Sequence, residues 1–160
     1  MSIVTIIPAR YASTRLPGKP LLDIAGKPMI QLVVERVRQA SRIDRIIVAT
    51  DDERIAAAVR SFDGEARLTA GDHPTGTDRL AEVAQALPDA KLIINVQGDE
   101  PLIPPQAIDA LAAVFVDQPD LQMATLITSL TDEEAANPAV VKVAASLDGY
   151  ALYFSRSLIP

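Results

Sequence analysis

Three cationic side chains, Arg10, Arg15 and Lys19, stand within ten residues of one another near the N-terminus. They follow an apolar run at 3–7, and their segment is rich in proline and glycine. Arginine offers a planar fork of donors for phosphate oxygens, and lysine adds a compact point charge. Because an α/β sheet presents its ligand at the carboxyl ends of its strands, this segment predicts a site for a densely anionic ligand. The alternative interpretation is a solvated loop.

Acidic residues follow two later apolar runs. Asp51 and Asp52 come after the run at 45–50, and Asp99 comes after the run at 92–96. In a parallel sheet these strand ends share an edge with the cationic loop, so we expect Asp99 to approach the same ligand. A magnesium ion would relieve repulsion between Asp99 and phosphates, since Mg²⁺ binds through one or two carboxylates together with substrate phosphates. We interpret Asp52 as a helix cap, and a turn cap is the alternative for Asp99.

Other patterns exclude several kinds of site. The chain has neither the Gly-x-x-x-x-Gly-Lys-Ser/Thr pattern of P-loop NTPases nor the Gly-x-Gly-x-x-Gly pattern of dinucleotide-binding proteins. Its single histidine, His73, lies in a polar loop and has no partner for a histidine metal site or a catalytic triad. Gly76 and Thr77 stand at the start of a predicted helix, where backbone N–H groups can face a ligand and Thr77 can serve as the cap.

Strand-like and helical patterns alternate along the chain. Apolar runs predict strands at 3–7, 45–50, 65–69, 92–96 and 123–127. Helical patterns predict helices at 29–40, 53–61, 78–87, 106–116 and 132–136. Asp148-Gly149 lies between apolar runs at 140–144 and 150–154 and predicts an antiparallel hairpin. The alternation implies right-handed βαβ crossovers and an α/β fold. This would be a Rossmann-like, mostly parallel sheet with helices on both faces, extended by the hairpin near the C-terminus.

Composition bounds the class of protein. The 160 residues are 49% hydrophobic and 22% charged, which predicts one globular domain over 1–160. A formal net charge of −6 argues against a nucleic-acid or anionic membrane partner but allows a small anion in a local pocket. The chain has no cysteine, hence no disulfide and no thiolate metal site. No stretch approaches the roughly 20 apolar residues of a membrane helix, so we expect a soluble, cytoplasmic protein. The chain stops straight after an apolar segment, and we expect a domain truncated at its C-terminus.

Five blocks of the sequence carry a resemblance to a known family. They are PARYASTRLPGKPL (8–21), IVATD (47–51), GTDR (76–79), NVQGDEP (95–101) and GYALYFSR (149–156). In this order they resemble motifs of the 3-deoxy-manno-octulosonate cytidylyltransferases, also called CMP-Kdo synthetases. The related CMP-sialate synthetases have a different loop after the Pro-Ala-Arg start. The resemblance runs along the whole chain and implies the nucleotide-diphosphosugar transferase fold.

The resemblance also implies a reaction and a role for individual residues. CMP would pass from CTP to the anomeric hydroxyl of 3-deoxy-D-manno-octulosonate (Kdo), giving CMP-Kdo and pyrophosphate for lipopolysaccharide biosynthesis, with Mg²⁺ as cofactor. The implied nucleotide-binding residues are Ala9, Arg10, Arg15, Lys19, Thr75, Gly76 and Arg79. Gln97 would lie near the sugar and Asp99 would bind the metal, and the implied catalytic residues are Arg15, Lys19 and Asp99.

Members of this family are considerably longer than 160 residues. The additional part would hold a second metal-binding carboxylate, much of the sugar pocket and the contacts of a homodimer. Two alternatives remain open. One is a cytidylyltransferase for another sugar acid, such as sialate, and the other is a CTP-binding module without turnover.

Overall fold

The computed structural model describes residues 2–12 and 16–159 of the chain. The chain divides into two compact units, Met1–Ala124 and Thr125–Pro160. The single domain over 1–160 that composition predicts stays a prediction. Among the described residues, no helix combines the length and the apolar character needed to cross a lipid bilayer.

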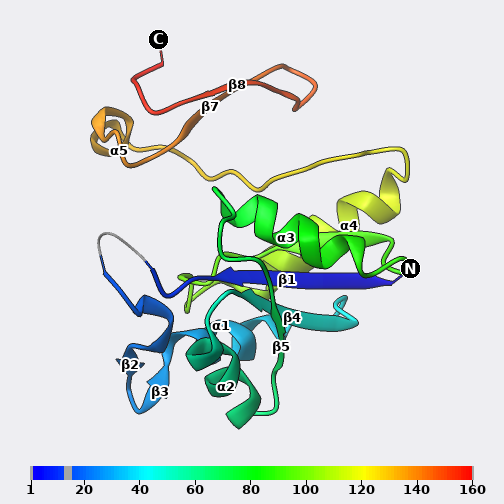
Figure 1. Ribbon diagram of the computed structural model, residues 1–160. Helices are drawn as coiled ribbons and strands as arrows, with labels where there is room; N and C mark the ends of the chain where they lie inside the picture. Colours follow the sequence, from blue (N-terminus) through cyan, green and yellow to red (C-terminus); the bar gives the residue numbers. More distant parts are fainter. Residues whose placement is uncertain (1, 13–15, 160) are drawn as a thin grey trace. The chain divides into compact units, whose positions relative to one another are not determined.

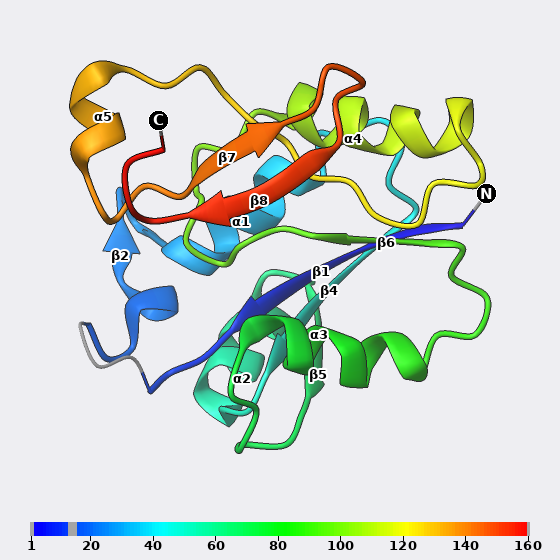
Figure 2. The ribbon, with the colours of Figure 1, turned by 90° about the horizontal axis from the view of Figure 1, so that it is seen from above.

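A four-stranded parallel sheet forms the centre of the larger unit (Figures 1 and 2). Its strands are β1 (Ile3–Ala9), β4 (Arg45–Thr50), β5 (Glu65–Leu68) and β6 (Leu92–Asn95), in the order β5-β4-β1-β6. In the register of the sheet, Ile6 of β1 lies opposite Ile47 and Asn95. The connection from β5 to β6 carries the chain past β1, so the strand order reverses between β1 and β6. Open α/β sheets bind their ligands at such a reversal, outside the carboxyl ends of the strands.

Helices cover both faces of this sheet, as predicted (Figure 1). On one face lies α3 (Gly76–Gln85), whose Val83 packs in a cluster with Val4 and Ile6. The other cluster contains Ile7 and buried residues of α1 (Met29–Val37), α2 (Glu53–Ser61) and α4 (Pro105–Asp117). Because β1 is enclosed from both sides, it reads as an almost continuous apolar run. The predicted α/β fold is therefore confirmed for this unit.

Side-chain caps fix where two of the helices begin. Asp52 caps α2 by accepting a hydrogen bond from the backbone N–H of Arg54 at 2.9 Å, as predicted. The prediction that Thr77 caps the next helix was wrong. That helix, α3, begins at Gly76, because Thr75 and Asp78 form a capping box in which each side chain bonds the other residue's backbone N–H.

Between β1 and α1 the chain makes two short elements that the sequence did not predict. They are the 3-10 turn η1 (Lys19–Leu21) and a small antiparallel hairpin of β2 (Asp23–Ile24) and β3 (Lys27–Pro28). Ala25 and Gly26 join the two strands with positive φ angles of 54° and 85°, the conformation of a tight hairpin turn. Strands of two residues each show no alternation that a sequence pattern could reveal.

The smaller unit contains α5 (Asp132–Ala136) and an antiparallel hairpin of β7 (Lys142–Ala145) and β8 (Ala151–Ser155). The predicted hairpin is confirmed, but it forms its own two-stranded sheet rather than extending the parallel one. The strand predicted at 123–127 was wrong, since this segment is irregular. Its side chains Met123 and Ile127 are exposed, and a strand needs a neighbour to take up its backbone hydrogen bonds.

Candidate functional site

A pocket of about 600 Å³ lies in the larger unit at the carboxyl ends of β1 and β6. Three segments of the chain supply most of its lining: the end of β1 with the loop that follows it, the start of α3 with the residues before it, and the turn after β6. Met29, the first residue of α1, completes it. Every predicted site residue that the structure describes lines this pocket, namely Ala9, Arg10, Lys19, Thr75, Gly76, Arg79, Gln97 and Asp99. Arg15, which the resemblance also places in the site, lies outside the described residues.

Close backbone packing at the end of β1 brings these segments together. A Cβ atom on Gly98 would lie 2.7 Å from the carbonyl oxygen of Pro8, so the turn after β6 approaches β1 as closely as only glycine allows. A Cβ atom on Gly76 would lie 3.3 Å from Cγ of the same proline. Pro8 is therefore in contact with both the acidic turn and the first residue of α3.

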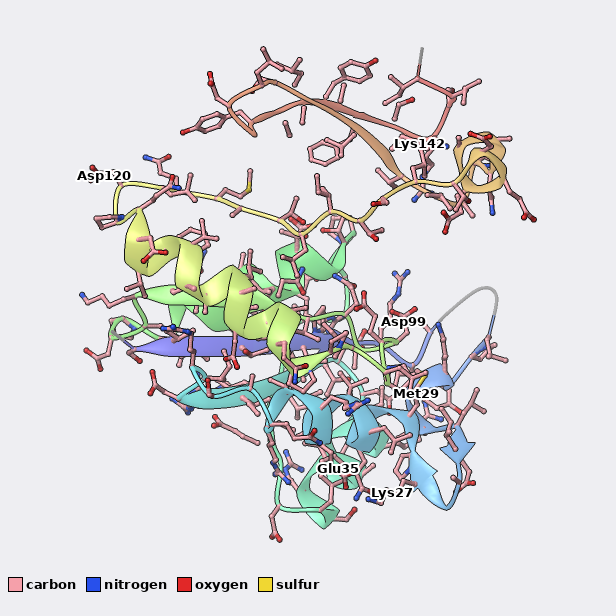
Figure 3. All side chains as sticks on the ribbon, turned by 180° about the vertical axis from the view of Figure 1, so that it is seen from behind. Lys27, Met29, Glu35, Asp99, Asp120 and Lys142 are labelled. Atoms are coloured by element: carbon pink, nitrogen blue, oxygen red, sulfur yellow. The ribbon has the colours of Figure 1, made fainter. Side chains whose placement is uncertain are left out.

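Lys19 and Asp99 form an ion pair across the pocket. The Nζ atom of Lys19 donates to Oδ2 of Asp99 at 2.6 Å, and the side chains are 39% and 51% exposed. Asp99 is labelled in Figure 3. Eighty positions separate these residues in the sequence, so the strand ends of the sheet bring them together as predicted. Burial and the neighbouring charge of Asp99 raise the pKa of Glu100, the next residue. The acidic turn therefore concentrates negative charge beside the cationic loop.

The start of α3 forms the opposite wall of the pocket. Thr75 and Asp78 satisfy two of the groups at this helix end through the capping box. The N–H groups of Gly76 and Thr77 belong to the first turn, where an α-helix offers donors and a positive dipole end to an anion. The first turn of α3, with its exposed backbone N–H groups, therefore suits a phosphorylated or otherwise anionic ligand.

Arg79 is built into the protein more deeply than the sequence indicated. Its side chain is 3% exposed, and its Nη2 atom lies 3.0 Å from Oδ2 of Asp51. Its Nη1 atom donates to the hydroxyl of Thr69 and, at 3.4 Å, to the carbonyl oxygen of Ala70. The guanidinium thus ties α3 to the ends of β4 and β5. No sequence pattern predicts the Asp51–Arg79 pair, and contact of Arg79 with a nucleotide stays a prediction.

His73 lines the pocket, in the segment 73–79 that the family resemblance places around the nucleotide. Its Nε2 atom is hydrogen-bonded to the Glu82 carboxylate, which also accepts from the backbone N–H of Ala70 at 3.1 Å. The hydrogen bond from His73 is the main reason that the pKa of Glu82 is lowered. His73 and Glu82 together fix the segment 70–75 against α3. They stand nine positions apart, a spacing that no sequence rule connects.

The donor set of the pocket fits a magnesium ion held jointly with phosphates. In the part of the chain that the structure describes, no three acidic, histidine or cysteine side chains gather into a cage for a metal. Mg²⁺ does not need one, because it keeps several waters and is bound through one or two carboxylates plus phosphate oxygens. The half-exposed carboxylate of Asp99, beside cationic side chains that suit phosphates, has the chemistry of such a ligand.

The fold and the site together define a Rossmann-like α/β protein with a pocket suited to a phosphorylated ligand. A sequence model of the cytidylyltransferases matches residues 4–160, and the chain belongs to this family.

Within this family, the chain is similar to relatives of one particular kind. The chain is 55% identical to the 3-deoxy-manno-octulosonate cytidylyltransferase of Geobacter sulfurreducens and 56% identical to that of Syntrophotalea carbinolica, in each case over 100% of this chain and 64% of the relative. The resemblance found in the five sequence blocks is thereby confirmed. The chain spans just under two thirds of the length of these curated relatives.

Solved structures agree with the sequence comparison. A CMP:2-keto-3-deoxy-manno-octonic acid synthetase complexed with CTP has a TM-score of 0.96 and 51% identity, over 100% of this chain and 66% of that one. A cytidylyltransferase from Leptospira borgpetersenii has a TM-score of 0.64 and 25% identity, over 75% of this chain and 51% of that one.

Proposed function

We propose that this chain carries the CTP-binding part of an enzyme that transfers CMP from CTP to the anomeric hydroxyl of Kdo. The products would be CMP-Kdo, for lipopolysaccharide biosynthesis, and pyrophosphate. The observation that carries the proposal is the Lys19–Asp99 pair in a pocket lined by all the described residues of the implied nucleotide site. The likeness to a synthetase complexed with CTP supports the same ligand.

The proposed reaction asks the protein to position charges rather than to form a covalent intermediate. The oxygen of the sugar hydroxyl forms a bond to the α-phosphorus and gives up its proton to solvent, while the bond from that phosphorus to pyrophosphate breaks on the opposite side. The reactants must therefore be held in line. Lys19 has three N–H donors and can keep Asp99 while donating to a phosphate oxygen of the leaving group. Arg10 supplies a second cation to the triphosphate, and the N–H groups of Gly76 and Thr77 receive the nucleotide at the helix start. Gln97 offers an amide to the sugar.

We propose Mg²⁺ as the cofactor, with Asp99 as the residue of the described pocket that would hold it. When bound, the ion would reduce the negative charge that repels the attacking hydroxyl and would favour ionisation of that hydroxyl. Lys19, whose ammonium has donors beyond the one that bonds Asp99, would direct its charge toward the phosphates.

We further propose that the whole enzyme is a homodimer in the cytoplasm, where nucleoside triphosphates are available, with no nucleic-acid or membrane partner. The support for association is the apolar surface of the smaller unit. Leu152, Tyr153 and Phe154 of β8 are 67%, 48% and 56% exposed, and exposed apolar patches mark interaction sites. Sedimentation analysis over a range of concentrations measures this directly, and a monomer at all concentrations would contradict it.

A second candidate function is a CTP-binding module without turnover. The observation that favours it is that the chain covers only 64% of its curated relatives. A further alternative is that another sugar acid, such as sialate, is the acceptor of CMP. The 55–56% identity to enzymes named for Kdo argues against this alternative.

Two measurements decide among these functions. Calorimetric titration with CTP and Mg²⁺ tests the nucleotide site, and pyrophosphate release with Kdo or sialate tests turnover and the sugar. We expect CTP binding by this chain, and pyrophosphate release by the whole enzyme with Kdo but not with sialate. Binding without release would favour the module, and release with sialate would favour the other sugar acid. Absence of CTP binding would contradict every version of the proposal.

A further inference from the structure

The guanidinium of Arg54 stacks on the ring of Tyr11 outside the pocket. Its Cζ atom lies 3.4 Å from the centroid of the ring. Arg54 belongs to the first turn of α2, whereas Tyr11 lies in the loop after β1, directly after Arg10. Arg54 is 61% exposed and does not line the pocket. The stack therefore connects a surface helix to the cationic loop.

Asp52 holds the guanidinium over the ring. Its Oδ1 atom accepts from Nε of Arg54 at 2.9 Å, and its Oδ2 atom accepts from Nη2 at 2.6 Å. These hydrogen bonds are the first reason that the pKa of Asp52 is lowered. Asp52 is also the cap of α2, and this helix is anchored in the core by Ile55 and Val59. A two-point bond to an anchored residue fixes the plane of the guanidinium, as ring stacking requires.

Tyr11 in turn closes the loop just before Lys19. Its carbonyl oxygen accepts a hydrogen bond from the backbone N–H of Gly18 at 2.9 Å. Gly18 also lies against the tyrosine ring, because a Cβ atom there would be 3.0 Å from Cε2 of Tyr11. Gly18 has a left-handed φ of 69° and is the residue from which η1 starts with Lys19. Contacts thus continue from Arg54 through Tyr11 and Gly18 to the lysine that pairs with Asp99.

We propose that Arg54 and Tyr11 are positioning residues for the triphosphate. Arg10 and Lys19 bring like charges to this loop, and the stacked ring holds the closing end of the loop against α2. Lys19 is thereby kept at the edge of the pocket where phosphates would bind. This inference rests on the proposed CTP site and adds to it two residues that do not line the pocket.

The test compares the affinities of Arg54→Met and the wild-type chain for CTP and for CMP, by calorimetry with Mg²⁺. Methionine keeps an aliphatic stem and removes the stacked charge. We expect CTP to bind about three to five times more weakly, the ratio that one exposed cation–π contact corresponds to. CMP, which lacks the outer phosphates, is expected to lose clearly less.

Two further variants separate positioning from damage to the fold. Arg60→Met is the matched control, because Arg60 lies on the same helix and forms an exposed ion pair with Glu53 away from the loop. Its affinity for CTP should equal that of the wild type. Tyr11→Leu should weaken CTP binding at least as much as Arg54→Met. Tyr11→Phe, which keeps a ring for the guanidinium, should restore most of that loss.

The outcomes distinguish this inference from the proposed function. Wild-type affinity in Arg54→Met would overturn the positioning role while leaving the CTP site in place. Equal losses for CTP and CMP would also overturn it, because they would show a general disturbance rather than misplaced phosphate contacts. Failure of the wild-type chain to bind CTP would overturn the proposed function, and the positioning role with it.

Discussion

The larger unit, Met1–Ala124, encloses apolar side chains on both faces of its sheet, and Ile6, Ile7 and Ile47 are completely buried. Among the described residues of the smaller unit, 125–159, no apolar side chain is buried. The one buried side chain among these described residues is that of Lys142, which is 4% exposed. The larger unit therefore has a hydrophobic core of the ordinary kind, whereas polar contacts hold the smaller unit.

Two lysines show the same contrast. Lys142 is enclosed by backbone: its Nζ atom donates to the carbonyl oxygens of Asn137 at 3.0 Å, Val140 at 2.9 Å and Arg156 at 2.5 Å. All three donors of the ammonium are used, so the group is buried without an unsatisfied hydrogen bond. Lys19 pairs with a single carboxylate among the described residues, that of Asp99, and is partly exposed. A lysine whose donors are all taken stabilises the structure, and one with donors to spare can bind a ligand.

The largest effect is expected from Lys19→Ala, because it removes a charge aimed at the proposed triphosphate. Affinity for CTP should fall by about tenfold to a hundredfold, as expected for the loss of a charged hydrogen bond. The melting temperature should hardly change, since exposed ion pairs contribute little stability. Lys27→Ala is the control, because Lys27 forms an ion pair of similar exposure with Glu35 at 2.8 Å outside the pocket (Figure 3). Normal CTP binding with a lowered melting temperature would reverse the roles given to the two lysines.

Lys142→Met should lower the stability of the smaller unit, whereas Lys19→Ala should lower the affinity for CTP. Three backbone carbonyl groups lose a charged donor. We therefore expect the free energy of unfolding of the smaller unit to fall by about 2–3 kcal/mol. Hydrogen exchange should become faster over 137–159, while the strands of the larger unit keep their protection. Unchanged exchange in the smaller unit would show that its stability comes from elsewhere.

Gly98→Ala tests the close packing in the larger unit. The new methyl group would meet the carbonyl oxygen of Pro8 at 2.7 Å, a backbone atom that cannot rotate away. We expect a loss of about 2 kcal/mol in the free energy of unfolding, measured with denaturant, together with weaker CTP binding. Gly71→Ala is the matched control, because nothing lies within 4 Å of its added Cβ. Equal stability of both variants would mean that the contact at Pro8 can relax.

The smallest effect is expected on stability at low pH, where the ion pair between Arg45 and Glu65 is lost. The pKa of Glu65 is lowered, first by its hydrogen bond from Arg45 and against the opposing effect of burial. A carboxyl group with a lower pKa in the folded state contributes stability above its unfolded pKa of about 4.3, and that stability is lost as the pH falls through the folded pKa.

The wild type should therefore lose slightly more melting temperature than Glu65→Gln when the pH is lowered from 6 toward 3. The corresponding difference in the free energy of unfolding should be below about 1 kcal/mol, since the ion pair is partly exposed. Glu53→Gln removes the exposed carboxylate that pairs with Arg60 and serves as the comparison. Parallel melting curves for wild type and Glu65→Gln would show that the pair does not contribute.

Sequence patterns predicted best where the chain is buried in a regular element. The strands around Ile6, Ile47 and Ile94 are apolar runs because a parallel strand is covered on both faces by helices. The meeting of Lys19 with Asp99 also followed from the sequence, because parallel strands end at one edge. The strand predicted at 123–127 was wrong for the opposite reason: an apolar run says nothing about whether a partner strand exists.

Several contacts of the site could not be predicted because tertiary packing alone creates them. Asp51 pairs with Arg79, and His73 with Glu82, only after α3 has been placed over the ends of β4 and β5. The stack of Arg54 on Tyr11 likewise joins segments that have no relation in sequence. Residue types could identify the ligand-facing loops, but not the residues that hold those loops.

Pro8 gives the pocket a mechanical property of its own. The same proline touches Gly98 through its carbonyl oxygen and lies beside Gly76 through its ring. Any displacement of this one residue is transmitted to the acidic turn and to the helix start at once. The acidic turn and the start of α3 are therefore coupled through Pro8. A substitution meant to change the width of the pocket would be made at the end of β1.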